Sequence, residues 1–305
     1  MSAAAPLITV AVCTYNRAEL LDGCLASLAA QTADPALFEV ILVDNNSADA
    51  TAEIAAGFTG RHAHFRYVKE AKQGLSNARN RGWQESRGSY VAYMDDDAKA
   101  FPDWVAVMAD FISRKPGVAA FGGPYIEFST AAIPAWFPPG YGSWTLDGGE
   151  RRIKIGEEWI NGTNMVYRAD LLRESGGFSK DLGMTGSVIS YGEETHLLLR
   201  LNKAGHEVWF IPDLRVWHLL AEYKLHLAWL LKASLGVGKS WSKTSGVRRN
   251  LYSHFRGLVK AGLLGCLRFA SPEAIPFKRR LYRALEPLCQ EWGALAGFLI
   301  DQRKF

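Results

Sequence analysis

The first 120 residues alternate short apolar segments with segments whose apolar residues recur at helical spacing. Residues 7–13 and 38–43 are apolar except for Thr9 and Glu39, and such segments are typical of strands buried on both faces of a sheet. Between them, residues 18–31 carry apolar side chains three and four positions apart, which predicts an amphipathic helix. The same patterns predict further helices over 48–58, 76–86 and 102–114 and strands over 64–68, 89–93 and 118–121. This alternation predicts an α/β fold with a mostly parallel sheet flanked by helices.

Charge divides the chain into two unequal parts. Of its 305 residues, 48% are hydrophobic and 22% charged, which is an ordinary globular composition. Residues 221–305 contain 15 Lys and Arg against 5 Asp and Glu, a net charge of +10. Since the whole chain carries +4, the first 220 residues carry −6. We therefore expect an α/β domain over residues 1–222 and a basic, amphipathic helical extension over residues 223–305.

The sequence predicts a cytoplasmic protein. The first six residues contain no Lys or Arg ahead of the apolar run at 7–13, which argues against a secretory signal peptide. No uninterrupted apolar stretch reaches the roughly 18 residues of a membrane span. The four cysteines have no C-x-x-C spacing, so reduced thiols are expected rather than disulfides or a zinc site.

Three consecutive carboxylates, Asp95, Asp96 and Asp97, follow the apolar segment at residues 89–93. In α/β sheets, ligands bind at the carboxyl ends of the strands. Adjacent carboxylates repel one another, and a hard divalent cation such as Mg²⁺ or Mn²⁺ relieves that repulsion through oxygen ligands. A metal-held phosphate is therefore the functional interpretation. The alternative is an acidic start to the helix predicted from Pro102, because Asp near a helix start is favourable in any protein.

Polar clusters also follow the first two predicted strands, at residues 14–17 and 44–47. Asp44 is suited to accept a hydrogen bond from a ribose hydroxyl or a base N–H, and Arg17 is suited to bind phosphate. A third cluster, at residues 74–80, carries a second candidate anion-binding arginine, Arg79. The alternatives are turn chemistry for the second cluster and a helix cap at Ser76 for the third.

The order of these motifs resembles the family 2 glycosyltransferases of GT-A fold. The motifs are Thr14-Tyr15-Asn16-Arg17, Asp44-Asn45-Asn46-Ser47, Gly74-Leu75-Ser76-Asn77-Ala78-Arg79-Asn80 and Asp95-Asp96-Asp97. Two later segments, Asn161-Gly162-Thr163-Asn164-Met165 and Tyr191-Gly192-Glu193-Glu194-Thr195, resemble the acceptor-side loop and the acidic catalytic motif. The resemblance covers residues 7–220. It implies a GT-A-type mostly parallel sheet flanked by helices, with a C-terminal helical extension.

The resemblance also implies roles for individual residues. The nucleotide-binding residues would be Thr14, Asn16, Arg17, Asp44, Asn46, Arg79, Asp95 and Asp96. Mn²⁺ or Mg²⁺ would be held by Asp95, Asp97 and His218, with a buried structural role as the alternative for His218. Asn164 and Trp159 would contact the acceptor or the donor sugar.

The catalytic base of the family sits in a Glu-Asp pair, where this chain has Glu193 and Glu194. We assign the base to Glu194, with Glu193 as the second candidate. A carboxylate that deprotonates the acceptor hydroxyl as it attacks the sugar gives inversion at the anomeric carbon in one displacement. The alternative is that both residues open a helix over 195–204, where acidic side chains favour the macrodipole.

The resulting hypothesis is a metal-dependent inverting glycosyltransferase of cell-surface polysaccharide synthesis. Its donor would be a nucleotide sugar, expected to be a UDP-sugar, and its acceptor a growing or lipid-linked saccharide. The rival hypotheses are a sugar-phosphate nucleotidyltransferase and a non-catalytic glycan-binding relative. The basic extension suits either an anionic membrane surface at the inner face of the plasma membrane, with salt-reversible docking, or a solvated helical face. Nucleic acid is not an expected partner, because no recognised module accompanies the charge.

Overall fold

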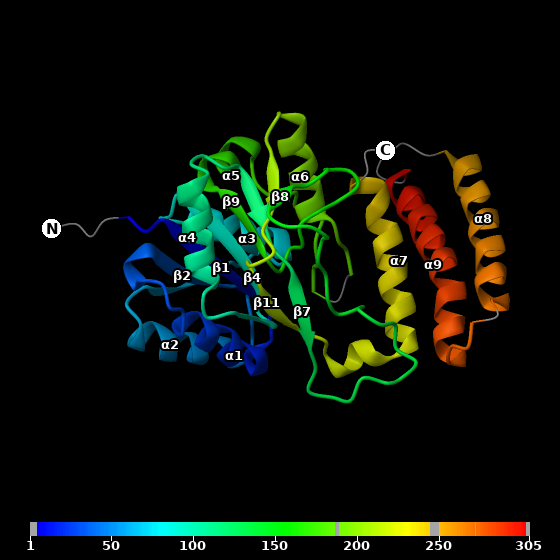
Figure 1. Ribbon diagram of the computed structural model, residues 1–305, viewed down its shortest axis with the longest axis horizontal. Coiled ribbons are helices and arrows are strands. Elements are labelled where there is room, and N and C mark those ends of the chain that lie inside the picture. Colours follow the sequence, from blue (N-terminus) through cyan, green and yellow to red (C-terminus); the bar gives the residue numbers. More distant parts are fainter. Residues whose placement is uncertain (1–4, 187–188, 245–249, 272, 303–305) are drawn as a thin grey trace. The chain divides into compact units, whose positions relative to one another are not determined.

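The computed structural model describes residues 5–186, 189–244, 250–271 and 273–302 (Figure 1). These residues form two compact units. The first unit comprises the chain up to Phe128 together with Gly142–Lys180 and Glu194–Leu219. The second comprises Ser129–Tyr141, Asp181–Glu193 and the residues from Leu220 on. Two segments from the middle of the sequence thus belong to the same unit as the C-terminal helices. The domain boundary at residue 222 stays a prediction.

Four parallel strands form one half of the main sheet of the first unit. They are β1 (Ile8–Thr14), β2 (Phe38–Asp44), β3 (Phe65–Lys69) and β4 (Tyr90–Asp95), in the spatial order β3-β2-β1-β4. Every described residue of β2 is buried, as expected for a strand covered on both faces. The sequence-based strand predictions are confirmed here, with ends that differ by one or two residues.

The sheet continues past β4 with strands that break the parallel pattern. The order is β9 (Met165–Arg168), β6 (Ala120–Gly122), β10 (Val208–Phe210) and β8 (Arg151–Arg152), and β9 runs antiparallel to both of its neighbours. A second, three-stranded sheet has the order β5 (Ala98–Ala100), β11 (Val216–Leu219), β7 (Tyr125–Phe128). This smaller sheet brings a late segment of the chain beside the residues that follow β4.

Hydrophobic side chains fill both faces of the main sheet because successive residues of a strand point to opposite sides. In β1, Val10 and Val12 belong to one buried cluster and Ala11 belongs to another. The first cluster includes residues of α1 (Ala18–Ala29), α2 (Thr51–Arg61) and α4 (Trp104–Arg114), and the second includes residues of α5 (Ala169–Ser175) and α6 (Glu193–Lys203). The predicted α/β architecture with helices on the sheet is confirmed.

Three helices begin one to three residues away from their predicted starts, at 51 in place of 48, 75 in place of 76 and 104 in place of 102. Helix α3 (Leu75–Gln84) begins directly after Gly74, whose φ of 129° is accessible mainly to glycine, so Ser76 lies inside the first turn and does not cap the helix. Helix α4 begins at Trp104, and the short strand β5 separates it from the three carboxylates. The alternative that these carboxylates form an acidic helix start is therefore excluded.

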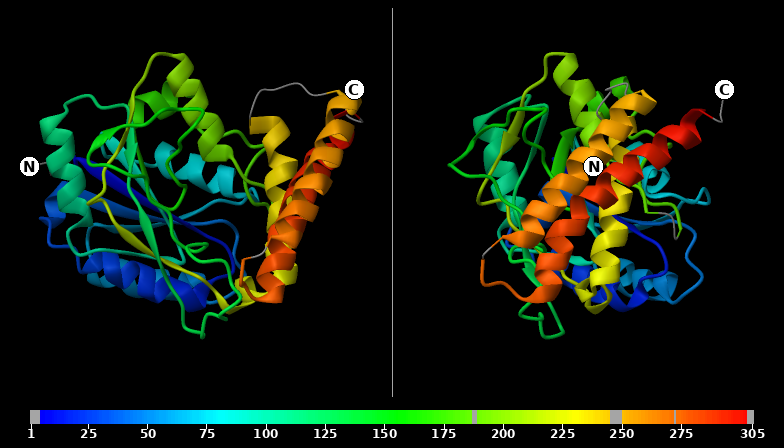
Figure 2. Two further views of the ribbon diagram at one scale, coloured as in Figure 1. Left: turned by 45° about the vertical axis from the view of Figure 1, so that its right-hand side comes forward. Right: turned by 90° about the vertical axis from the view of Figure 1, so that its right-hand side faces the viewer.

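The second unit consists mainly of helices. After the short 3₁₀ segment η2 (Glu222–Leu225) come α7 (Leu227–Thr244), α8 (Leu251–Ala270) and α9 (Phe277–Gln302), and α9 packs against both α7 and α8 (Figure 2). Arg279 of α9 donates hydrogen bonds to the backbone carbonyls of Ala135, Trp136 and Phe137. These bonds, with a buried cluster that includes Phe137 and Leu230, hold the segment Ser129–Tyr141 in the helical unit.

Candidate active site

The register of the parallel strands brings three polar segments to one edge of the sheet. Thr14, the last residue of β1, pairs with Asp44, the last residue of β2, and Cys13 pairs with Asp95, the last residue of β4. The carboxyl ends of neighbouring parallel strands are the usual ligand-binding edge of an α/β sheet. Most of the residues predicted to bind nucleotide therefore lie at or directly after the ends of adjacent strands.

Asp95, Asp97 and His218 form a cluster at this edge. Each of them offers a ligand atom, and these atoms lie within 4.8 Å of one another. The Nε2 atom of His218 is 3.2 Å from Oδ1 of Asp97. Pairing of β11 with β5 sets His218 opposite Ala98, and the Leu219 N–H donates to the Asp97 carbonyl at 2.9 Å. Backbone hydrogen bonds thus fix the imidazole beside the acidic segment.

Two arginines compensate the negative charge of the acidic segment. Arg17 Nη1 lies 3.1 Å from an oxygen of Asp96 and 3.1 Å from an oxygen of Asp97. Arg79, which is 3% exposed, places Nη2 3.2 Å from Asp95 Oδ1 and 3.3 Å from the Gly162 carbonyl. Both candidate anion-binding arginines therefore contact the acidic segment that carries the predicted metal ligands.

Burial raises the pKa of Asp96 to about 7, because desolvation disfavours its charged form. The Arg17 guanidinium opposes this rise in pKa, and the neighbouring carboxylate of Asp97 adds to it. The carboxylates of this segment therefore repel one another in spite of the nearby arginine. Two carboxylates and an imidazole match the donor preferences of Mn²⁺, so the residues present fit the divalent cation expected from the sequence.

Turn hydrogen bonds organise the two clusters after β1 and β2. Asn16 and Asn46 adopt left-handed φ values of 51° and 67°. The side-chain oxygen of Asn16 accepts from the Ala48 N–H at 2.8 Å, and the backbone N–H of Asn16 donates to Ser47 Oγ at 3.0 Å. The turn chemistry considered for these segments is thus present, and it links the two strand ends to each other. Nucleotide contacts by Thr14, Asn16 and Asn46 stay predictions.

Asp44 is held in place by a residue that sequence reasoning missed. The Tyr67 hydroxyl, from β3, donates to Asp44 Oδ2 at 2.6 Å, and the Ser47 N–H donates to Oδ1 at 2.7 Å. Burial and the Asp44 carboxylate raise the pKa of Tyr67 to about 12, so its hydroxyl keeps its proton and acts as a donor. No sequence motif marks Tyr67, because its role depends on the pairing of β3 with β2.

The two candidate bases begin α6. Glu193 is buried and Glu194 is half-buried, and the helix starts at Glu193, so the helix-opening position considered for this pair is observed. Acidic residues at a helix start are stabilised by the macrodipole, which does not exclude a second role for one of them. The choice between Glu193 and Glu194 as base stays a prediction.

The two residues predicted to contact a sugar have different surroundings. Asn164 is fully buried, and its amide nitrogen donates to the carbonyls of Pro124 and Leu214 while its oxygen accepts from the Trp104 indole. These bonds join β9 to the loops before β7 and β11, so Asn164 has a structural role. Trp159 is 47% exposed and has ring surface available for stacking. A sugar contact by either residue stays a prediction.

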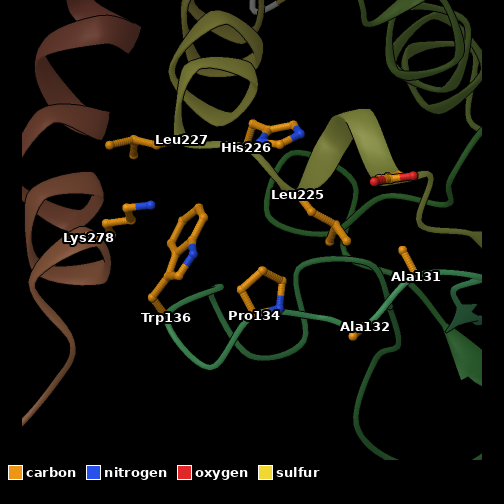
Figure 3. Close-up of a pocket in the computed structure, with 9 residues that line it drawn as sticks. Ala131, Ala132, Pro134, Trp136, Leu225, His226, Leu227 and Lys278 are labelled. Carbon is orange, nitrogen blue, oxygen red and sulfur yellow. The ribbon is translucent and has the colours of Figure 1, made fainter.

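The second unit contains a pocket of its own, with a volume of about 390 Å³ (Figure 3). Ala131, Ala132, Pro134 and Trp136 contribute one part of its wall, and Leu225, His226 and Leu227 contribute another. Lys278 also lines it, with its ammonium nitrogen 5.6 Å from the centre of the Trp136 ring, and Glu222 adds a carboxylate. The Pro- and aromatic-rich segment at residues 129–141 thus borders a mixed apolar and charged pocket.

Solved structures of other proteins share this fold. The mannosyltransferase PcManGT from Pyrobaculum calidifontis, solved with GDP-Man and Mn²⁺, matches with a TM-score of 0.65 at 19% sequence identity, over 97% of this chain and 88% of that one. TarS (residues 1–349) from S. aureus, solved with UDP, matches with a TM-score of 0.56 at 16% identity, over 98% of this chain and 92% of that one. These likenesses confirm the GT-A-like fold expected from the sequence.

Sequence relatives point the same way. A glucosyl-dolichyl phosphate glucuronosyltransferase from Haloferax volcanii is 29% identical over 239 residues, which are 76% of this chain and 75% of that protein. The succinoglycan biosynthesis protein ExoM from Rhizobium meliloti is 28% identical over 236 residues, which are 76% of this chain and 73% of that protein. The family model described as "Glycosyl transferase family 2" matches residues 9–175, more than half of the chain. This chain therefore belongs to glycosyl transferase family 2.

Proposed function

We propose that this glycosyltransferase moves a sugar from a nucleotide-diphosphate donor, expected to be a UDP-sugar, to a hydroxyl of a saccharide or lipid-linked acceptor. The observation that carries the proposal is the cluster of Asp95, Asp97 and His218 beside two arginines at the carboxyl edge of the parallel strands. Negative charge builds on the leaving diphosphate as the sugar–phosphate bond breaks, and this edge concentrates the groups that stabilise such charge.

The residues at this edge have complementary roles. A bound Mn²⁺ or Mg²⁺ would act as a Lewis acid on the departing diphosphate, held by Asp95, Asp97 and His218. Arg17 contacts Asp96 and Asp97 at this edge. The guanidinium of Arg17 would also bind the diphosphate of a donor placed there. Arg79, fixed by Asp95 and the Gly162 carbonyl, adds positive charge that needs no reorganisation during the reaction.

We assign deprotonation of the acceptor hydroxyl to Glu194. The carboxylate takes the proton as the hydroxyl oxygen attacks the anomeric carbon, and the nucleoside diphosphate leaves from the opposite face of the sugar, which inverts the configuration. Glu193 is the second candidate for this role.

The names of the relatives support a lipid-linked or polysaccharide acceptor. One relative is named for a dolichyl phosphate substrate and another for succinoglycan biosynthesis. A lipid-linked acceptor requires the enzyme to work at a bilayer surface, and we place this enzyme peripherally on the cytoplasmic face of the plasma membrane.

The proposal is tested by nucleotide binding. UDP should bind with Mn²⁺ present, and excess EDTA or Asp97→Ala should abolish binding in isothermal titration calorimetry, because the anionic edge would then repel the diphosphate. Asp22→Ala, which removes an exposed carboxylate from α1, is the matched control and should bind as the unmodified protein does. UDP affinity that is unchanged in EDTA would contradict the metal assignment.

Turnover of nucleotide sugars distinguishes the rival activities. We expect slow hydrolysis of a nucleotide sugar with Mn²⁺ in the absence of acceptor, releasing the free sugar and UDP. Formation of a nucleotide sugar from a sugar phosphate and a nucleoside triphosphate would indicate a nucleotidyltransferase. Donor binding with neither reaction, across a panel of donors, would indicate a non-catalytic relative.

A further inference from the structure

Helix α8 carries an exposed apolar stripe along its whole length. Tyr252, Phe255, Val259, Leu263 and Leu267 recur every three or four residues, and they are between 49% and 71% exposed. At 100° per residue these five side chains lie within about 120° of one another around the helix. Leu251, Leu264 and Phe269 of the same helix are exposed as well. Large side chains in a continuous row on one helix face are unusual for a surface that meets only water.

The opposite face of α8 is the one that packs. His254, Ala261 and Gly265 are its buried residues, and a Cβ added at Gly265 would lie 2.5 Å from the Ala284 carbonyl oxygen of α9. Small residues thus let α8 lie close against α9, while the large apolar residues point away from the core. Within the part of the chain that the structure describes, nothing covers the apolar stripe.

The charge on α8 indicates what covers the stripe. The helix contains three basic residues and no Asp or Glu between Leu251 and Ala270. Arg256 and Lys260 are exposed and follow Phe255 and Val259 directly, so they border the stripe. Residues 221–305 together carry +10. An apolar row bordered by basic side chains is complementary to a lipid bilayer, which has an apolar interior and anionic head groups.

We propose that α8 lies in the interface of an anionic bilayer, with its apolar stripe inserted among the acyl chains and Arg256 and Lys260 among the lipid phosphates. A helix of 20 residues is about 30 Å long, and an interfacial helix of this kind buries its apolar face roughly 5–10 Å deep. No helix in the described ranges is long and apolar enough to cross the membrane. A second copy of the chain fits less well, because symmetric pairing through α8 would face one acid-free basic surface with another. This inference deepens the peripheral placement proposed above, but vesicle binding by α8 can be tested without any transfer activity.

This arrangement changes the salt dependence expected from charge alone. Electrostatic attraction to anionic lipid is screened by salt, whereas burial of apolar side chains is not. The full-length protein should therefore sediment with vesicles of 70% phosphatidylcholine and 30% phosphatidylglycerol, and 1 M NaCl should weaken this binding without abolishing it. Complete release in 1 M NaCl would overturn insertion of the stripe.

The stripe and its basic border are tested by paired substitutions in the full-length chain. Leu263→Gln with Leu267→Gln should lower partitioning into these vesicles by at least about tenfold, because two leucines no longer enter the acyl region. The control is Leu37→Gln with Ile133→Gln, two exposed apolar residues outside α8, which should partition normally.

The basic border is tested by Arg256→Gln with Lys260→Gln. Each lost charge should lower partitioning by about fivefold, so the pair should lower it by at least tenfold. Its control is Lys180→Gln with Lys203→Gln. All four positions on α8 are exposed, and equal helical circular dichroism would show that the variants are folded.

The native thiol Cys266 reports on insertion itself. It is exposed on α8 between Gly265 and Leu267, whereas Cys24 is buried and Cys13 and Cys289 are only partly exposed. An environment-sensitive dye on Cys266 should shift its emission to the blue when anionic vesicles are added. Vesicle binding without such a shift, or equal partitioning of the leucine pair and its control, would overturn the proposal. So would a lipid-free dimer in analytical ultracentrifugation that Leu263→Gln with Leu267→Gln dissociates, since the stripe would then be an interface between copies.

Discussion

Buried amides and carboxylates do much of the positioning in the candidate site. The Asn45 amide donates to the carbonyls of Glu70 and Lys72 and accepts from the Gly74 N–H, so it fixes the turn that precedes α3. Asn164 joins strands in the same way from the other side of β4. The Gly74 N–H and the carbonyls of Pro124 and Leu214 are buried, and each would cost about 1–3 kcal/mol without a partner. The positions of Arg79 and Asp95 therefore depend on side chains that need not touch a substrate.

The assignment of the catalytic base to Glu194 rather than Glu193 gives a prediction at the residue scale. Glu194→Gln should lower kcat by roughly 10²-fold or more while leaving donor affinity nearly unchanged, because the amide cannot accept the acceptor's proton. The measurement is steady-state transfer or hydrolysis together with calorimetric binding of the donor. Near-normal turnover in Glu194→Gln, alongside an inactive Glu193→Gln, would transfer the role of base to Glu193.

Close approach of backbones determines how the helices of the second unit pack. A Cβ added at Gly238 of α7 would lie 1.9 Å from the Gln290 carbonyl oxygen, and one added at Gly293 of α9 would lie 2.1 Å from the Leu235 carbonyl oxygen. Both values are far below a van der Waals contact, and the atoms that would be met are backbone atoms, which cannot rotate away. The two helices therefore need glycine at both crossing points.

This packing gives a prediction at the scale of the element. Gly238→Ala should destabilise the helical unit by at least about 2 kcal/mol, because α7 and α9 must move apart to admit the methyl group. Gly262→Ala in α8 is the matched control, since the nearest atom to its added Cβ is a leucine methyl at 3.9 Å. It should leave stability unchanged or raise it by about 0.5–1 kcal/mol through helix propensity. Thermal unfolding followed by circular dichroism at 222 nm measures both, and equal effects of the two substitutions would contradict the close packing.

At the scale of the whole molecule, the chain crosses between its two units several times. Segment Ser129–Tyr141 leaves the α/β unit to join the helices, and the chain then returns for β8, β9 and α5. Phe137 shares a buried cluster with Leu225, Leu230 and Tyr282, all of which follow residue 222. The C-terminal helices therefore help to hold Ser129–Tyr141 in place, although this segment lies in the middle of the sequence.

A chain that ends at Glu222 should show this dependence. Loss of α7 and α9 would expose Phe137 and remove Arg279, so we expect a lower melting temperature and concentration-dependent light scattering relative to the full chain. A chain that ends at residue 302 keeps all of these contacts and is the control. If the shorter chain is monomeric and melts like the full one, residues 1–222 fold independently of the C-terminal helices, as the predicted boundary at residue 222 requires.

The sequence by itself determined the α/β class, the helices and strands of the first half and the segments that carry the candidate site. These features depend on local patterns, because the period of apolar residues distinguishes strands from helices and polar residues mark the strand ends. The edge at which residues 14–17, 44–47 and 95–97 meet also follows, since parallel strands present their carboxyl ends together. Helix starts do not follow as closely, as Ser76 and Pro102 show, because a cap depends on backbone angles that several residues can adopt.

The tertiary structure alone decided the contacts between segments far apart in the chain. The family resemblance groups His218 with Asp97, but no local pattern does so, since they meet only because β11 pairs with β5. Tyr67 holds Asp44 because β3 pairs with β2. The sequence predicts an amphipathic helix here but does not say which of its faces is covered. In the structure, the small residues of α8 pack against α9 and its large apolar residues are exposed. Such contacts depend on how separate elements pack, and that packing is set by the whole chain rather than by any local pattern.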